Sequence, residues 1–334
     1  MPKISVIIPN WNGKHYLGDC LGSLRKQTFG DFETILVDNG SEDGSVPWVR
    51  TEFPEVNVIA LPANRGFTGG ILGGYEQATG ELIVLLNNDT EAHPNWLQSI
   101  HAASQAYSRA GSFASKMMYF DDRSRIENCG FDLGSAGTTI DLGRDEPDGP
   151  VWAQPRKVFG ACGGAAAYRR SMLEDIGFLD DDFFLIYEDV DLSFRAQLRG
   201  YDCVYVSDAV VYHRYRMTIG RAPSRQVFYS QRNIEFVYLK NMPLELLLRT
   251  APQRLLYEMG AAIYFARLGA ASAFVRAKLS ALRCLPSILL KRREIQRKRT
   301  RTNSQMQAIM RKSRYSHKWK KFHSAWARPA GQQS

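Results

Sequence analysis

The sequence predicts an α/β protein in which a mostly parallel central sheet is flanked by helices and followed by a basic helical C-terminal region. Short β-branched apolar runs alternate with helical patterns in the first half of the chain, which is typical of repeated strand–helix–strand units. These runs are continuous, as expected for strands that are covered on both faces. From about residue 240 onward, apolar residues recur at helical spacing among many arginines and lysines.

The individual elements follow from these patterns in chain order. Of the 334 residues, 44% are apolar and 23% are charged, which excludes a disordered, collagen-like or coiled-coil chain. The apolar runs predict strands at 4–8, 33–37, 56–61 and 82–86. Helices are predicted at 16–27 and 46–52, and a glycine-rich turn at 64–70 leads into a third helix that ends near residue 78.

The segment after residue 120 is less regular. Residues 120–157 are polar and glycine-rich, so we expect an irregular excursion over the functional face. Further strands are predicted at 158–168 and 203–212. Between them, the segment 183–195 is expected to run into a helix that ends near Gly200.

The charge of the chain is divided unevenly. The net charge is +9, but residues 240–334 hold twenty-one Lys or Arg against three Asp or Glu, whereas residues 1–239 carry a net −9. We therefore expect a domain over 1–240 and a basic amphipathic helical region over 241–334 with a disordered end. Because the body is acidic, no nucleic-acid partner is expected, and any anionic surface is expected to meet the C-terminal region.

The cysteines and the apolar segments bear on location. The five cysteines are far apart and form no Cys-x-x-Cys pair, so neither a disulfide framework nor a zinc site is predicted, and a reducing compartment is expected. The apolar run near the N-terminus is too short for a signal-peptide core, and no apolar stretch is long enough for a membrane span. A cytoplasmic protein is therefore expected.

Polar residues gather where the first four predicted strands end. The clusters are Asn-Trp-Asn-Gly at 10–13, Asp-Asn-Gly-Ser at 38–41, Asn-Arg-Gly at 64–66 and Asn-Asn-Asp at 87–89. Each cluster alone is explained by turn chemistry. In an open parallel sheet, however, ligands bind beyond the carboxyl ends of the strands. Four clusters on one edge therefore indicate a nucleotide site, although the chain has no Walker sequence.

Five segments together resemble the inverting family-2 glycosyltransferases, which have the GT-A fold, and most closely their rhamnosyltransferase-like branch. The segments are SVIIPNWNG at 5–13, VDNGS at 37–41, NRGF at 64–67, LNND at 86–89 and EDVDL at 188–192. Their order and spacing match the family from about residue 3 to about 240. The resemblance implies a GT-A domain that binds a nucleoside diphosphate sugar.

The resemblance also implies which residues bind the donor. Asp38 matches the carboxylate that accepts a hydrogen bond from the nucleobase, a charge-assisted interaction. A local turn is the alternative explanation for Asp38, and a solvated surface charge is the alternative for Arg65. The residues implied in nucleotide-sugar binding are Pro9, Asn12, Asp38, Asn64, Arg65, Asn87 and Asn88.

A divalent metal, magnesium or manganese, is implied at the end of the fourth strand. Asn87-Asn88-Asp89 matches the family's Asp-x-Asp, which holds a metal on the donor diphosphate. Asn87 replaces the first acidic residue, so Asp89 is the one acidic ligand, unless it only caps the following segment. His213 follows the strand predicted at 203–212 and is a second candidate ligand, with a structural role as the alternative.

Asp189 matches the acidic residue that acts as the general base. Inversion requires the acceptor hydroxyl to attack opposite the leaving diphosphate while a carboxylate takes its proton. Glu188 and Asp191 are expected to support it, and Arg195 is placed to pair with Asp191 one helical turn away. The alternative is that these acidic residues only begin a helix, where they complement its dipole.

Two explanations are open for the C-terminal region. The segment 244–290 and the basic run that follows resemble interfacial helices whose apolar faces enter a membrane while Lys and Arg meet anionic lipid. Trp319 and Trp326 would suit the same boundary. The alternative is a helical cap packed on the first domain and followed by a disordered basic end.

The sequence therefore predicts an inverting, metal-assisted glycosyltransferase of polysaccharide or cell-wall biosynthesis. It would move a sugar from a dTDP- or UDP-sugar, with rhamnose favoured, to a hydroxyl of a glycan or lipid-linked saccharide. The location expected is the cytoplasmic face of a membrane, to which the protein is bound peripherally. The alternatives are a nucleotidyltransferase that makes the sugar nucleotide, and a catalytically silent membrane-associated scaffold that retains the nucleotide fold.

Overall fold

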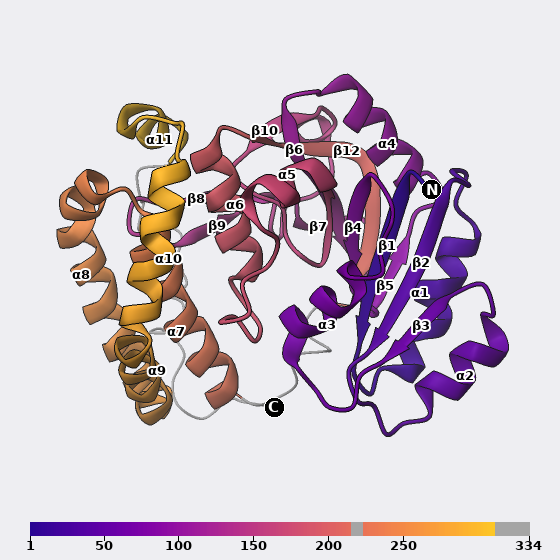
Figure 1. The fold of residues 1–334 in the computed structure, drawn as a ribbon, viewed down its shortest axis with the longest axis horizontal. Helices are drawn as coiled ribbons and strands as arrows, with labels where there is room; N and C mark the ends of the chain where they lie inside the picture. Colours follow the sequence, from indigo (N-terminus) through magenta and orange to yellow (C-terminus); the bar gives the residue numbers. More distant parts are fainter. Residues whose placement is uncertain (215–222, 311–334) are drawn as a thin grey trace.

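A large mixed sheet runs through the computed structural model, which describes residues 1–214 and 223–310 (Figure 1). Within these residues, ten strands form one sheet in the order β10-β12-β6-β11-β4-β1-β2-β3, with β5 paired to β12 and β7 paired to β6. The strands are β1 (Ile4–Asn10), β2 (Phe32–Asp38), β3 (Asn57–Ala60), β4 (Leu82–Leu86), β5 (Thr90–Ala92), β6 (Ala110–Tyr119), β7 (Ile126–Asn128), β10 (Arg156–Val158), β11 (Ala165–Arg169) and β12 (Asp202–His213).

The strand directions confirm the prediction of a mostly parallel sheet. β1 is parallel to both β2 and β4, and β2 is parallel to β3. β11 runs antiparallel between β4 and β6, and β6 is parallel to β12. The strand predicted at 82–86 is β4 with the same bounds. Its five residues are all buried, as its continuous apolar sequence requires.

Helices cover both faces of the sheet. One apolar core includes residues of α1, α2 and α4, and the other includes residues of α3, α5 and α6. In α1, Leu17, Leu21 and Leu24 are buried because their spacing puts them on one side of the helix. These helices are α1 (Lys14–Arg25), α2 (Ser45–Glu52), α3 (Gly66–Tyr75), α4 (Trp96–Ala106), α5 (Arg170–Ile176) and α6 (Glu188–Arg199).

Two predictions about the middle of the chain were wrong in part. The strand predicted at 158–168 is two strands, β10 and β11, separated by a loop. The chain must pass close to α6 there, since a side chain at Gly160 would lie 2.4 Å from Ser193 Oγ. The excursion at 120–157 is more regular than expected, because it contains β7, β8 (Phe131–Leu133), β9 (Thr139–Asp141) and a short 3₁₀ helix (Pro150–Trp152).

The C-terminal helices pack on the sheet domain through α6. Phe194 of α6 and Phe183 share a core with Phe236 of α7 and Ile288 of α10. The division predicted at residue 240 remains a prediction, and α7 runs across that position. The helices are α7 (Pro223–Asn241), α8 (Leu244–Arg267), α9 (Ala271–Arg283), α10 (Leu285–Lys298) and α11 (Asn303–Ile309).

Two expectations concern membranes, namely the lack of a membrane span and the role of the C-terminal end. Among the residues that the structure describes, none of the helices is long and apolar enough to cross a membrane. Trp319, Trp326 and the disordered end predicted from the sequence lie outside the described residues.

Close packing at Gly80 gives a test of the fold. A side chain at Gly80 would lie 2.5 Å from the backbone nitrogen of Ser5 and 2.7 Å from the carbonyl carbon of Ile4, in the strand β1. Because that backbone cannot move without disturbing the sheet, we expect Gly80→Ala to lower the free energy of unfolding by about 1–3 kcal/mol. Urea denaturation measures this change.

Gly22 of α1 is the matched control. No atom lies within 4 Å of the position its side chain would take, and the residue is helical. Gly22→Ala should therefore leave the stability unchanged or raise it by up to about 1 kcal/mol. Equal effects of the two substitutions would contradict the packing described here.

Candidate active site

Asn10 joins the carboxyl ends of three neighbouring strands. Its Nδ2 donates to Asp38 Oδ1 over 3.0 Å, and Asn88 Nδ2 donates to Asn10 Oδ1 over 2.8 Å. All three side chains are buried. Parallel pairing sets Asn10 directly beside Asp38, so polar residues far apart in sequence meet at one edge of the sheet. Sequence analysis placed Asn10 in a polar cluster at a strand end but did not name it among the donor-binding residues.

Asp38 is held by hydrogen bonds from within the protein. It is 2% exposed. Its Oδ2 accepts from the backbone nitrogen of Ser41 at 2.9 Å, and its Oδ1 accepts from Ser45 Oγ at 3.3 Å. The contact with Ser41 is the local turn that the sequence left open as an alternative. The role of Asp38 in binding a nucleobase remains a prediction.

Asn12, Asn64 and Arg65 lie in the loops that border the same edge. Asn12 has a left-handed backbone with a φ of 50°, and its Oδ1 accepts from a backbone N–H in the loop after β2. Asn64 Oδ1 accepts from the backbone nitrogen of Gly66 at 2.8 Å, which begins α3. The side chain of Arg65 is exposed. These residues therefore surround the strand ends, and Arg65 is accessible to a ligand there.

Asn39 and Pro9 hold the start of α3 close to the strand ends. Asn39 Nδ2 donates to the carbonyl of Gly66 at 2.7 Å, and its Oδ1 accepts from the backbone nitrogen of Arg65 at 2.9 Å. A side chain at Gly70 would lie 3.3 Å from Pro9 Cβ, so glycine allows this approach. Asn39 lies in the polar cluster at 38–41, but sequence analysis gave it no role of its own, because asparagine next to glycine resembles an ordinary turn.

Asp89 and His213 face each other at the end of β4. His213 Nε2 lies 3.2 Å from Asp89 Oδ1 and 3.4 Å from Asn87 Nδ2. On the other side of the ring, His213 Nδ1 lies 2.7 Å from Glu127 Oε2. Burial disfavours a charge on the ring, but the hydrogen bonds to the two carboxylates outweigh it and raise the pKa of His213 to about 10. Between these two carboxylates the ring therefore favours its protonated, positively charged form when no metal is bound.

The donor set at this position fits a divalent metal that is shared with a ligand. A carboxylate oxygen and an imidazole nitrogen converge there, and both suit manganese or magnesium with additional oxygen ligands. Within the described residues, no three His, Cys, Asp or Glu side chains form a cluster that could hold a metal. The remaining ligands would therefore have to come from a bound phosphate group or water.

Asp189 is oriented by the backbone on both sides. Its Oδ2 accepts from the backbone nitrogen of Gly163 at 2.9 Å, and its Oδ1 accepts from the backbone nitrogen of Val190 at 2.7 Å. Burial raises the pKa of Asp189, although these two hydrogen bonds oppose the rise. Glu188 is buried, and its pKa is raised by burial and then by the charge of Asp189. A raised pKa means that each carboxylate binds a proton more readily than it would in water.

Two consecutive glycines connect Asp189 to the end of β4. Gly163 donates to Asp189, and the carbonyl of Gly164 accepts from the backbone nitrogen of Asn87 at 2.9 Å. A side chain at Gly164 would lie 3.3 Å from Asn87 Nδ2. The acidic helix start and the Asn87–Asp89 segment, a hundred residues apart in sequence, are therefore separated only by this dipeptide.

A left-handed turn directly before α6 places Asp189 beside Gly163. Ile186 and Tyr187 have φ angles of 69° and 75°, which are unusual for residues other than glycine and most of all for a β-branched one. Asn233 of α7 stabilises the turn, because its Nδ2 donates to the carbonyls of Leu185 at 2.9 Å and Ile186 at 2.7 Å. Such a conformation persists only where its surroundings fix it.

Asp191 points away from Asp189 into the protein. It is fully buried, and it lies 2.7 Å from Lys240 Nζ and accepts from Arg195 Nε at 2.9 Å. Asn241 Nδ2 also donates to it at 2.7 Å. The pair with Arg195 was predicted from the spacing and is confirmed. These contacts join α6 to α7, and the role of Asp191 as a support for Asp189 remains a prediction.

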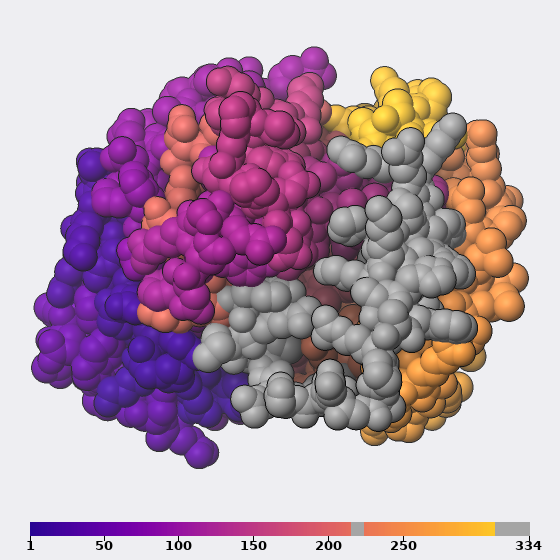
Figure 2. Space-filling model, turned by 180° about the vertical axis from the view of Figure 1, so that it is seen from behind, coloured from indigo at the N-terminus to yellow at the C-terminus, as the bar shows by residue number. Residues whose placement is uncertain are grey.

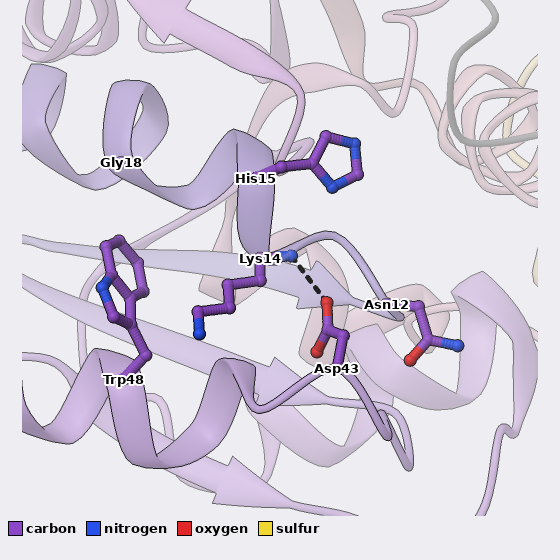
Figure 3. A pocket seen from close by; sticks show the side chains of 6 residues that line it. All are labelled: Asn12, Lys14, His15, Gly18, Asp43 and Trp48. Carbon is purple, nitrogen blue, oxygen red and sulfur yellow. Dashed lines mark hydrogen bonds between the residues drawn. The ribbon is translucent and has the colours of Figure 1, made fainter.

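A cavity of about 580 Å³ opens beside the strand ends, between α1 and α2 (Figure 3). It is lined by Asn12, Lys14, His15, Gly18, Asp43 and Trp48. The backbone nitrogen of Lys14 donates to Asp43 Oδ2 at 2.8 Å, which ties the start of α1 to the loop before α2. Of the residues predicted to bind a donor, only Asn12 borders this cavity.

The fold is that of a GT-A glycosyltransferase domain, and comparison with known proteins agrees. Residues 5–177 match the sequence model of glycosyl transferase family 2, and the chain belongs to this family. It is therefore a glycosyltransferase. Sequence analysis predicted this family and the GT-A fold, and both are confirmed.

Individual relatives share moderate similarity. The chain is 25% identical over 247 residues to N-acetylglucosaminyl-diphospho-decaprenol L-rhamnosyltransferase from Mycobacterium tuberculosis, covering 66% of this chain and 79% of the relative. The crystal structure of S. aureus TarS 1–349 with UDP gives a TM-score of 0.55 at 18% identity, covering 89% of this chain and 88% of the other.

A third similar protein is the mannosyltransferase PcManGT from Pyrobaculum calidifontis in complex with GDP-Man and Mn²⁺. Its TM-score is 0.52 at 17% identity, covering 84% of this chain and 87% of the other. At these identities the solved structures show a common fold. The chain spans between 17% and 79% of the lengths of curated relatives that it matches.

The raised pKa of Glu188 predicts a pH-dependent stability. Between the ordinary pKa of glutamate and the raised value, the folded state holds a proton that the unfolded state has released, so stability falls as pH rises through this window. Glu188→Gln removes this titration. We expect its melting temperature to exceed that of the wild type by a few degrees at pH 8 and by less at pH 5.

Glu42→Gln is the control, because Glu42 is exposed. Its difference from the wild type should stay constant over the same pH range. A constant difference for Glu188→Gln as well, measured by calorimetry, would contradict the raised pKa.

Proposed function

We propose that this glycosyltransferase moves a sugar from a nucleoside diphosphate sugar to an acceptor hydroxyl with inversion, and that Asp189 is the general base. One observation carries the proposal. The dipeptide Gly163–Gly164 contacts Asp189 on one side and Asn87 on the other, so the base lies next to the segment that would hold the donor diphosphate. A base on that side is suited to an acceptor that attacks opposite the leaving group.

The reaction follows from this arrangement. The acceptor oxygen forms a bond to C1 of the sugar, the bond from C1 to the phosphate oxygen breaks, and the hydroxyl proton passes to Asp189. The nucleoside diphosphate leaves with the electron pair of the broken bond. Gly163 and Val190 each donate to one oxygen of Asp189, so the carboxylate keeps one orientation and retains a lone pair on each oxygen for the proton.

Asp89 and His213 are proposed to hold manganese or magnesium together with the donor diphosphate. When bound, such an ion supplies charge stabilisation to the departing diphosphate. Asn87, Asn88 and Arg65 would contact the donor beside it. The similar structures contain GDP-Man with Mn²⁺ or UDP, which supports a nucleotide-sugar donor and a divalent metal. Asp38, Asn64, Pro9 and Asn12 are proposed to form the nucleoside side of the site.

We further propose that the donor is a dTDP- or UDP-sugar, with rhamnose favoured, and that the acceptor is a glycan or lipid-linked saccharide. Similarity to a rhamnosyltransferase named for a polyprenyl diphosphate acceptor supports rhamnose as the sugar and a lipid-linked saccharide as the acceptor. An acceptor of this kind lies at a membrane. The place of action proposed is the cytoplasmic face of that membrane.

The outer helices offer a surface that fits this location. In the described part of the chain, many large apolar side chains of α8, α9 and α10 are at least 49% exposed, among them Leu244, Leu248, Leu255, Leu256, Met259, Ile263, Val275, Leu279, Leu282, Leu289 and Leu290. Figure 2 shows α8 and α9, in orange, at one edge of the molecule. In α8 most of these residues recur at spacings of three, four or seven, and Leu256 is adjacent to Leu255, so they lie on one side of the helix.

Exposed arginines lie among these apolar side chains, including Arg249, Arg267, Arg276 and Arg283. Apolar side chains that enter the lipid interface beside cations that meet anionic headgroups are the two components of peripheral membrane binding. We therefore propose that α8–α10 bind an anionic membrane. The same helices also pack on α6 through α7 and α10, so the cap considered in sequence analysis and the membrane surface are compatible.

Replacing the proposed base tests the reaction. We expect Asp189→Asn to lower kcat by about 10²–10⁴-fold with little change in the KM for the donor, because the amide cannot accept the proton. A screen of dTDP- and UDP-sugars with Mn²⁺, followed by detection of the released nucleoside diphosphate and the glycosylated product, measures this. Formation of pyrophosphate would indicate a nucleotidyltransferase instead.

Asp181→Asn is the control for that experiment, because Asp181 is an exposed carboxylate in the loop before α6. It should transfer sugar at the wild-type rate. Full activity of Asp189→Asn under conditions in which the wild type is active would exclude Asp189 as the base.

Charges placed in the apolar surface test the membrane proposal. The double variant Leu255→Glu and Met259→Glu should lose at least about tenfold in binding to vesicles of anionic and neutral phospholipid, because each glutamate removes apolar contact and adds repulsion. Flotation of the full chain with vesicles measures binding, and high salt should weaken binding of the wild type.

Val151→Glu is the matched control, since Val151 is 66% exposed but lies in the sheet domain. It should bind vesicles as the wild type does. Equal binding by all three proteins would contradict the assignment of this surface.

A further inference from the structure

Glu127 is a buried acidic residue that no motif in the sequence indicated. It lies in β7 and is 3% exposed. β7 pairs with the end of β6, and Tyr119 of β6 pairs with His213 of β12, so Glu127 is brought to the end of β12. A buried carboxylate is costly unless it is paired. The residue that pairs with Glu127 therefore indicates the role of Glu127.

That partner is the imidazole of His213. Glu127 Oε2 lies 2.7 Å from Nδ1, while Nε2 faces Asp89 Oδ1 at 3.2 Å on the opposite side of the ring. His213 is 8% exposed and Asp89 is 1% exposed. Each ring nitrogen thus has one carboxylate partner, and the two partners come from β7 and from the segment after β4.

We propose that Glu127 is a positioning residue for His213 in the metal site that the proposed function requires. By accepting the Nδ1 proton, Glu127 fixes the ring and turns Nε2 toward Asp89, where Nε2 would bind a metal that displaces its proton. A carboxylate behind a metal-binding histidine orients the ring and increases its basicity, and losing it typically weakens metal affinity about 10–100-fold. The inference rests on the proposed metal site and deepens it.

The contacts of His213 favour a positioning role for Glu127 over a purely structural contact between β7 and β12. A purely structural contact between β7 and β12 would need only one nitrogen of His213. Here the other nitrogen, Nε2, faces Asp89 and lies 3.4 Å from Asn87 Nδ2. Both of those residues belong to the Asn87–Asp89 segment that is proposed to hold the donor diphosphate. The ring therefore links a buried carboxylate to the proposed metal position.

Manganese binding tests the proposal without any need for activity. Free Mn²⁺ is titrated against the full-length chain by electron paramagnetic resonance, alone and with UDP. Glu127→Ala should weaken Mn²⁺ binding by about 10–100-fold. Glu127→Gln should lose less, because its amide oxygen still accepts the Nδ1 proton. Glu146→Gln is the control, since Glu146 lies in the same segment and accepts from Trp152 Nε1 at 3.0 Å.

The outcomes separate this inference from the proposed function. Weaker Mn²⁺ binding in the order Ala, Gln, wild type supports the role of Glu127, whether or not sugar transfer is detected. A lower melting temperature of Glu127→Ala with unchanged Mn²⁺ affinity overturns it and leaves only a structural contact. If the wild type binds no Mn²⁺ in either condition, the inference is overturned together with the proposed metal site.

Discussion

The buried contact between Asp191 and Lys240 determines where the proposed catalytic residue lies. Lys240 Nζ lies 2.7 Å from Asp191 Oδ1 and 2.5 Å from Asp180 Oδ2, and all three side chains are largely or fully buried. Removing one partner of such a pair leaves an uncompensated charge and costs about 3–5 kcal/mol. Asp191 lies two residues after Asp189 on α6, so rotation of α6 that moved Asp189 away from Gly163 would also break this contact.

Helix α7 contacts the segment around Asp189 at two points, the turn before α6 and the first turn of α6. Asn233 binds the turn before α6, and Lys240 binds Asp191 within α6. The two residues are seven apart, which is two helical turns, so both lie on the same face of α7. The left-handed turn costs about 1–3 kcal/mol per residue, and this face of α7 is what stabilises it. The site on the sheet domain is therefore complete only with a helix from the C-terminal part.

Local pattern explains what could be predicted from the sequence. The strand at 82–86 is a continuous apolar run, and the pairing of Asp191 with Arg195 depends only on helical spacing. That Asp38 and Asn88 both contact Asn10 follows from the general rule about strand ends. Glu127 and Asn233 could not be found in this way, because their partners are 86 and about 47 residues distant and no local pattern links them. The prediction of one strand at 158–168 failed for the same reason, since the contact of the loop with α6 determines its path.

The basic residues of the C-terminal region fall into two groups. Some pair with carboxylates of the protein, and the others are available to attract an anionic membrane. Lys240 and Lys291 lie against Asp180, while Arg254 and Lys278 lie against Glu235, so these cations are paired with carboxylates, and Lys240 and Arg254 are buried as well. A basic residue that is paired with a carboxylate of the protein attracts lipid headgroups less than an unpaired one does. Among the residues that the structure describes, exposed arginines such as Arg249, Arg276 and Arg283 lie beside the apolar side chains of α8–α10 and can face an anionic surface. Membrane affinity should therefore follow that local combination of apolar area and arginine, and a change in the buried lysines should alter the position of α6 before it alters binding to lipid.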